Sequence, residues 1–163
     1  MKNILFYRVM PGVALAVCLV FAGCAMEAEE DEGLPSPKGK FTLTGASMAD
    51  SQYAFILTAL PSPSEDKLLG ISDSNKDGSK LKGAQIKDGT VKIPLYVCDT
   101  AGKVKSYDGD HTGVNIKIYI STQKEMTQDE IVNAEKYITF TNVTFEGGKA
   151  EKSVEAAYNK KLD

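Results

Sequence analysis

Strict alternation of apolar and polar residues in two runs, residues 90–97 and 114–120, constrains this chain more than any other feature. Successive side chains of a β-strand point to opposite faces of a sheet, so each run predicts a strand with one buried face. The first run contains Pro94, which has no N–H for a sheet ladder and therefore predicts an edge position or a bulge. The apolar positions are Val91, Ile93, Leu95 and Val97 in the first run and Val114, Ile116, Ile118 and Ile120 in the second.

The chain from about Lys40 onward is typical of an all-β domain. Short runs rich in Val, Ile, Thr, Tyr and Phe are separated by Gly, Asp and Asn. We expect one antiparallel β-sandwich of about seven or eight strands, with a small closed β-barrel as the alternative. The other expected strands are residues 41–44, 52–60, 68–72, 81–86, 137–145 and one near residues 150–156.

Local patterns add one helix and a doubly covered strand. Thr127 and Glu130 can close a capping box, so the helix should begin near Thr127 and end around Lys136. Residues 52–60 carry apolar side chains at both odd and even positions, which indicates a strand that is covered on both faces or lies near the middle of the sheet.

Two dipeptides and one change of parity predict turns and an irregular strand. Asp88-Gly89 and Gly147-Gly148 favour tight hairpin turns, since these residues tolerate positive φ. Within residues 137–145 the apolar residues change from even-numbered to odd-numbered positions, so one extra residue must be accommodated near Thr141 and Asn142. We expect a β-bulge or a bend at that point.

The N-terminal segment has the organisation of an export signal. Lys2 and Arg8 form a positive start, and residues 9–22 are largely apolar. This apolar run is shorter than the roughly 20 residues that a membrane-spanning helix needs. It ends in Ala22, Gly23 and Cys24, where small residues allow close approach of a peptidase and the thiol can accept a lipid.

The segment from Leu19 to Cys24 resembles the lipobox of bacterial lipoproteins. Phe21 stands where that family most often has leucine, a position that spirochaetal lipoproteins relax. The resemblance implies diacylglycerol on Cys24, with acyl chains such as palmitate, cleavage before this residue, and attachment to a membrane. Strand patterns in residues 39–45, 88–96 and 138–147 also resemble small β-rich surface lipoproteins of spirochaetes, whose molecular role is mostly unassigned. An ordinary secretory signal peptide is the alternative.

This reading divides the chain into a signal peptide, residues 1–23, a lipidated and acidic tether, residues 24–39, a β-domain, residues 40–158, and a tail, residues 159–163. Lys2 and Arg8 leave with the signal, so the 19 basic residues fall to 17 against 22 acidic residues, and the net charge changes from −3 to −5. No basic, aromatic-interleaved patch remains for nucleic acid. The expected location is the cell envelope, in the outer membrane or at the cell surface.

Asp73, Asn75 and Asp77, followed by Gly78, match the first half of a calcium loop. Counting Asp73 as position one, the bidentate glutamate expected at position twelve falls on Ala84. These three residues are candidate Ca²⁺ ligands if another loop lends a carboxylate. A polar hairpin loop without a metal is the alternative, and otherwise no cofactor is expected.

His111 is the only histidine, so a zinc site with two imidazoles from one chain is excluded. A mixed site could combine it with Asp108 and Asp110, the alternative being a solvated loop. A serine or cysteine nucleophile would have to use His111 as its base, and the chain has neither a nucleophile elbow nor a phosphate loop. We therefore expect that the protein is not an enzyme.

Cys98 is the one thiol left in the mature chain once Cys24 carries lipid, so an intramolecular disulfide is excluded. It can be a small buried residue or can link two copies of the chain. If the strands of residues 90–97 and 114–121 pair, their outer faces bring together four side chains that can stack flat ligands or meet acidic polymers. The alternative is that these side chains only stabilise the sheet. The four residues are Tyr96, Tyr119, Lys92 and Lys117.

Three functional classes follow from these patterns. A rigid β-scaffold on a lipidated stalk presents loops outward, which favours a binding or adhesion module with a protein or glycan ligand. An envelope structural or assembly subunit is the second class, and a small-ligand carrier joins it if the fold is a barrel. A hydrolytic enzyme is the third class.

Overall fold

The computed structural model describes residues 33–75, 78–156 and 158–161, which fold into strands and one short α-helix. The elements are β1 (Gly39–Thr44), β2 (Tyr53–Ala59), β3 (Lys67–Gly70), β4 (Asp73–Ser74), β5 (Leu81–Lys82), β6 (Ala84–Gln85), β7 (Thr90–Cys98), β8 (Val104–Ser106), β9 (His111–Ser121), β10 (Glu125–Met126), α1 (Gln128–Val132), β11 (Lys136–Phe145), β12 (Lys149–Ser153), the 3-10 turn η3 (Val154–Ala156) and β13 (Tyr158–Lys161).

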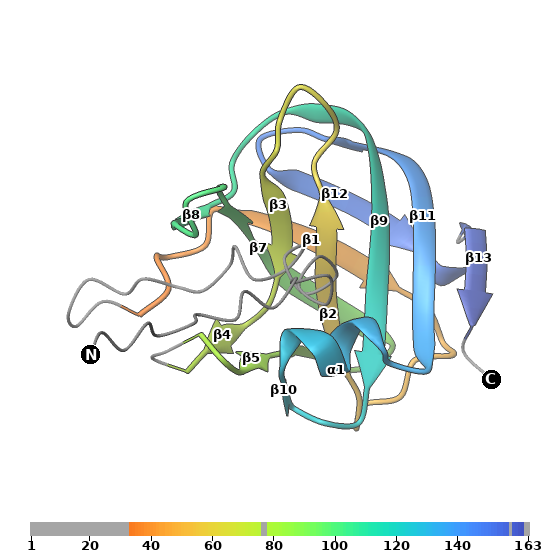
Figure 1. The fold of residues 1–163 in the computed structure, drawn as a ribbon. Coiled ribbons are helices and arrows are strands. Elements are labelled where there is room, and N and C mark those ends of the chain that lie inside the picture. The colour runs from red at the N-terminus through yellow and green to blue at the C-terminus, as the bar shows by residue number, and fades with distance from the viewer. Residues whose placement is uncertain (1–32, 76–77, 157, 162–163) are drawn as a thin grey trace, which may run out of the picture.

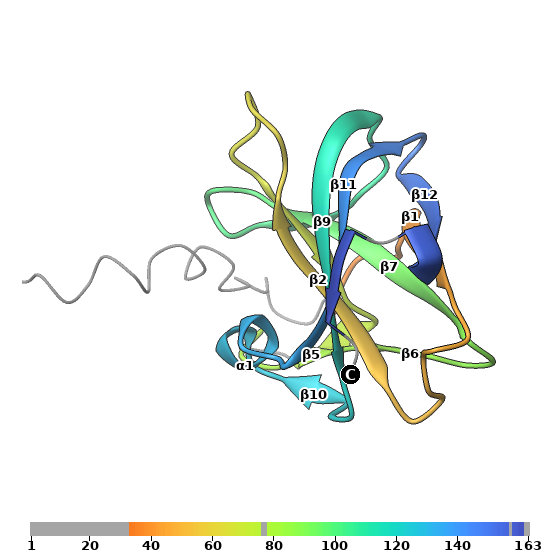
Figure 2. The same ribbon diagram turned by 90° about the vertical axis from the view of Figure 1, so that its right-hand side faces the viewer.

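Most of the described strands belong to one large sheet with the order β12-β1-β7-β3-β2-β9-β11-β13, in which β6 adds to β2 and β8 adds to β7. The sheet curls strongly and is nearly closed (Figures 1 and 2). A small sheet with the order β10-β5-β4 lies beside it. The predicted all-β fold with a short helix is therefore confirmed, with a form between a sandwich and a barrel.

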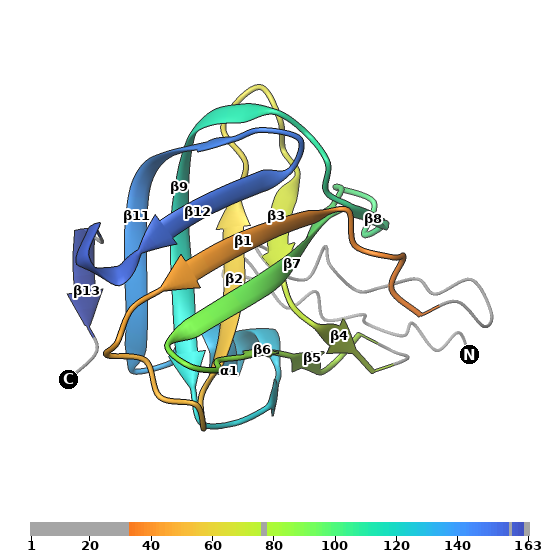
Figure 3. The same cartoon turned by 180° about the vertical axis from the view of Figure 1, so that it is seen from behind.

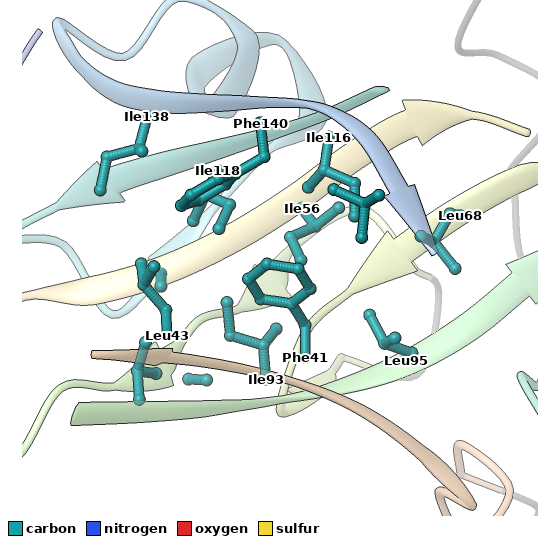
Figure 4. Packing of buried hydrophobic residues seen from close by; sticks show 14 of the residues in the cluster. Phe41, Leu43, Ile56, Leu68, Ile93, Leu95, Ile116, Ile118, Ile138 and Phe140 are labelled. Carbon is teal, nitrogen blue, oxygen red and sulfur yellow. The ribbon is translucent and has the colours of Figure 1, made fainter. Parts of the chain in front are cut away.

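The inside of the curled sheet is filled by apolar side chains, which we call the inner core. Phe41 on β1 is fully buried, and its ring centroid lies 5.9 Å from that of Phe140 and 6.3 Å from that of Phe145. Isoleucines from β2, β7, β9 and β11 pack around these rings (Figure 4). The alternating residues of β7 and β9 point into this space, as the sequence predicts. Because side chains occupy this space, the packing gives no support to an interior ligand.

A second apolar cluster, the outer core, lies on the outside of the curled sheet. It is covered by α1 and the small sheet, through Ile131, Met126 and Leu81. β2 contributes Phe55 to the outer core and Ile56 to the inner core, which explains why this strand has apolar side chains on both of its faces. The remaining outer-core residues are Leu57, Leu69, Ile71, Tyr96, Cys98 and Tyr119.

The local predictions for the helix and the irregular strand are confirmed. The side chains of Thr127 and Glu130 close the capping box, and α1 ends at Val132, earlier than expected. In β11 the register with β9 shifts between Phe140 and Val143, where Asn142 has φ 55°. The predicted hairpin turns also form, with bridges from Lys87 to Thr90 and from Glu146 to Lys149.

The structure corrects the prediction that Pro94 places β7 at an edge. β7 lies inside the sheet, between β1 and β3. Its pairing with β3 runs from Cys98 only as far as Leu95, opposite Gly70. Beyond that point the carbonyl of Pro94 accepts a hydrogen bond from the N–H of Ile71 at 3.1 Å. The N and C=O groups of one strand residue point to the same side, so the nitrogen of Pro94 also points toward β3. The ladder between β7 and β3 has already ended there, so the proline can be accommodated without an N–H.

Two further differences concern the ends of the domain. β12 pairs with β1 in parallel, whereas the sequence suggested an antiparallel sheet throughout. Residues 158–161 form β13 on the edge of β11 instead of a tail. Both pairings complete the curled sheet with the last segment of the chain, which Figure 3 shows from behind.

Candidate functional site

A cleft of about 470 Å³ lies where the β2–β3 loop meets the start of β9. The loop contributes two prolines and two serines, and its Ser62–Pro63 peptide bond is cis. The facing segment contributes a carboxylate, an imidazole and a hydroxyl, so several polar groups converge on one concave surface, as is usual in ligand sites. The lining residues are Pro61, Ser62, Pro63, Ser64, Asp110, His111 and Thr112.

His111 is held in this cleft by Tyr107. The Tyr107 hydroxyl lies 2.8 Å from His111 Nδ1, and the two rings stack with centroids 5.6 Å apart. Tyr107 also packs edge-on against Phe145, at 5.4 Å. The imidazole is therefore fixed on its Nδ1 side, and His111 also lines the cleft.

Burial of Tyr107, reinforced by the negative charge of Asp110, raises the pKa of its phenol to about 12. The hydroxyl consequently keeps its proton at every physiological pH. It can donate that proton to His111 Nδ1 when this nitrogen is the acceptor.

The pH dependence of tyrosinate absorbance tests this burial. We expect the difference in tyrosinate absorbance between wild type and Tyr107→Phe to titrate near pH 12. The other tyrosines are present in both proteins, so their absorbance cancels in this difference. In the unfolded chain a tyrosine pKa is about 10, so the folded state holds this proton more tightly. The protonated Tyr107 therefore stabilises the folded state fully below pH 10, and this stabilisation is lost as the pH rises to about 12. A difference titrating near pH 10 would contradict a buried Tyr107.

The loop that carries Asp110 and His111 is fixed by backbone contacts with two other segments. The Gly148 N–H donates to the Gly109 carbonyl at 2.9 Å, and the Gly147 N–H donates to the Asp110 carboxylate. A Cβ on Gly148 would lie 2.7 Å from the Tyr107 carbonyl oxygen, and one on Gly39 would lie 2.2 Å from the same atom. The site loop, the β11–β12 turn and the start of β1 therefore meet at a junction that has room only for glycine.

Chemically, this cleft can bind a polar ligand by hydrogen bonds. The hydroxyls and the imidazole can donate or accept, Asp110 accepts, and the proline rings offer apolar contact. The hydrogen bond that the structure records for His111 goes to Tyr107, and not to a serine. That the protein is not an enzyme stays a prediction.

The predicted calcium loop is only partly described, because Asp77 lies outside the described residues. Asp73 is 2.9 Å from Lys82 Nζ, and the hydrogen bond from this lysine lowers the pKa of the Asp73 carboxyl. Asn75 accepts a bond from the Lys80 N–H at 2.8 Å and donates to Ser79 at 2.9 Å. Both side chains thus stabilise a hairpin loop. No cluster of three or more acidic, histidine or cysteine side chains suited to a metal occurs among the described residues. The calcium site stays a prediction.

The surface patch predicted from Tyr96 and Tyr119 is corrected by the sheet order. β7 and β9 do not pair, since β3 and β2 lie between them. Tyr96 is 2% exposed and Tyr119 is 6% exposed, both in the outer core, and burial raises the pKa of each phenol. Neither ring can stack a ligand from solution.

The two lysines of the same predicted patch are separated as well. Lys92 is exposed on β7. Lys117 on β9 is half-buried, with Nζ 4.9 Å from the ring centroid of Tyr119 and 4.1 Å from that of Tyr137. These cation–π contacts stabilise the β9–β11 face, which agrees with the structural alternative for these side chains.

The two cysteines of interest differ in what the structure says of them. Cys98 is 1% exposed within the outer core, and a disulfide between two copies would need an accessible sulfur. Its position therefore favours the packing role. Cys24, the expected lipidation site, lies outside the described residues.

The cleft residues show what sequence reasoning missed. The sequence points to Asp110 and His111, but not to Tyr107, which contacts His111, or to the cleft residues Pro61 and Ser64. A proline-rich segment predicts the end of a strand, and only the fold brings that segment to His111. Tyr107 lies in a polar stretch, and its one signal was an aromatic residue among turn-forming residues.

Comparisons with family models, with curated proteins and with solved structures find no match to this chain. In the described part of the chain, no helix is both long and apolar enough to cross a membrane.

Proposed function

We propose that the protein is a lipid-anchored binding module of the bacterial cell envelope, exposed at the cell surface and without catalytic activity. The observation that carries this proposal is the segment from Leu19 to Cys24, in which an apolar run ends in two small residues and a cysteine. A β-domain follows in the same chain, and it has a cleft in which Tyr107 holds His111. A rigid scaffold of this kind, held by a lipid, suits the binding of a protein or glycan.

Metabolic labelling with a lipid precursor tests the anchor. Wild-type protein should incorporate the label and sediment with membranes, whereas Cys24→Ala should lose both properties. Cys18→Ala is the matched control, since Cys18 follows the bulky Val17 and should keep the label. An unlabelled wild type would remove the proposal.

Protease treatment of intact cells then locates the domain. Degradation of labelled protein supports exposure at the surface, and full protection would place the domain inside the envelope and contradict this part of the proposal. In a screen of proteins and glycans, Asp110→Asn is the informative variant. It keeps an oxygen that can accept from the Gly147 N–H while removing the charge that faces the cleft.

A further inference from the structure

The segment from Gly33 to Lys38 is bound to the surface of the domain, and we call it the strap. Leu34 packs against the outer core. The backbone N–H of Lys38 donates to Ser106 Oγ at 2.6 Å, and its Nζ lies 3.1 Å from the Asp108 carboxylate. The strap therefore leaves the domain beside β8, whereas the sequence predicted a free tether as far as residue 39.

The strap and the last strand lie on opposite sides of the molecule. In Figure 1 the orange segment that begins at Gly33 lies on the left with β8, and β13 lies on the right. Figure 3 shows the same separation from behind. The segment that connects the domain to Cys24 is therefore attached on the side of β8, away from β13.

The chain between the lipid and the strap is short compared with the domain. Leu34 follows Cys24 by ten residues, which span at most about 35 Å when fully extended. A domain of about 120 residues approximates a sphere with a radius of about 18 Å, so half its circumference is about 55 Å. A chain anchored at Leu34 cannot reach around the domain to the side of β13. If the first fixed residue were Gly39 instead, the reach would rise to about 53 Å and would nearly suffice.

We infer that the strap limits how the domain can turn on the membrane, so that the side of β13 cannot face the lipid surface. This inference rests on the proposed lipidation of Cys24. The loop between β2 and β3 lies at the top in Figure 1, to the side of the axis from strap to β13. This loop, which lines the cleft, therefore lies on neither the strap side nor the β13 side of the domain.

Fluorescence quenching on vesicles tests this orientation. The lipidated full chain is purified from membranes and reconstituted in phosphatidylethanolamine–phosphatidylglycerol vesicles that contain a lipid with a nitroxide on its headgroup. A fluorophore is attached at Lys103→Cys, beside β8, or at Glu155→Cys, in η3 next to β13; both positions are exposed. Cys98 is buried and should not react. We expect at least threefold stronger quenching at position 103 than at position 155.

Loosening the strap should reduce this difference. Leu34→Ala combined with Lys38→Ala deletes the Leu34 packing and the ion pair with Asp108 but keeps the backbone bond to Ser106, so the ratio of quenching at the two positions should fall toward one. Lys40→Ala is the matched control, since this lysine is exposed on β1 and should leave the difference unchanged. Equal quenching in wild type that floats with the vesicles would overturn the orientation alone. Failure to float would overturn the lipid anchor, and the orientation with it.

Discussion

Gly148→Ala is expected to lower the free energy of unfolding by about 2 to 5 kcal/mol. Gly148 has φ +72°, a conformation that costs other residues about 1–2 kcal/mol. An added Cβ would also meet the Tyr107 carbonyl oxygen at 2.7 Å and Asp108 Cα at 2.8 Å, and such overpacking costs about 1–3 kcal/mol more. Both contacts are backbone atoms, which cannot turn away as a side chain would.

Gly147→Ala is the matched control for this variant. Its φ is +53°, but a Cβ there would have no neighbour within 4 Å. We expect only the conformational cost of about 1–2 kcal/mol. Urea unfolding of both variants measures the difference between their free energies of unfolding. This difference reports the steric cost of placing a Cβ where the three segments meet. Equal losses would contradict the tight junction. Because the junction holds the site loop, Gly148→Ala should also bring the Tyr107 titration closer to pH 10.

Phe41→Ala is expected to lower the free energy of unfolding by about 3–5 kcal/mol, a large part of the total for a domain of this size. Phe41 is fully buried in β1, and its ring contacts those of Phe140 and Phe145 from β11. Its removal leaves a cavity between two strands that are distant in the sheet order, so the surroundings cannot easily collapse.

Phe41→Leu should cost less, about 1–1.5 kcal/mol, because much of the apolar volume is kept. Lys40→Ala, at the neighbouring exposed position, should lie within about 0.5 kcal/mol of wild type. Urea unfolding again provides the measurement. A loss below about 1 kcal/mol for Phe41→Ala would mean that the inner core is loosely packed, and the carriage of a small apolar ligand would then regain support.

Features that depend on residues close together in the chain could be predicted from the sequence. These features are the alternation of apolar residues in β7 and β9, the capping box at Thr127, and the irregular pairing near Asn142, where the apolar residues change from even to odd positions. Each of these follows from backbone geometry over a few residues, or from which face of a strand its side chains occupy.

The order of the strands in the sheet could not be predicted from the sequence and follows from the folded structure. Insertion of β3 and β2 between β7 and β9 buried Tyr96 and Tyr119 and removed the predicted patch. The same arrangement brought Pro61–Ser64 to His111 and formed the cleft. Strand order depends on the summed packing of side chains far apart in the chain, which no local pattern encodes.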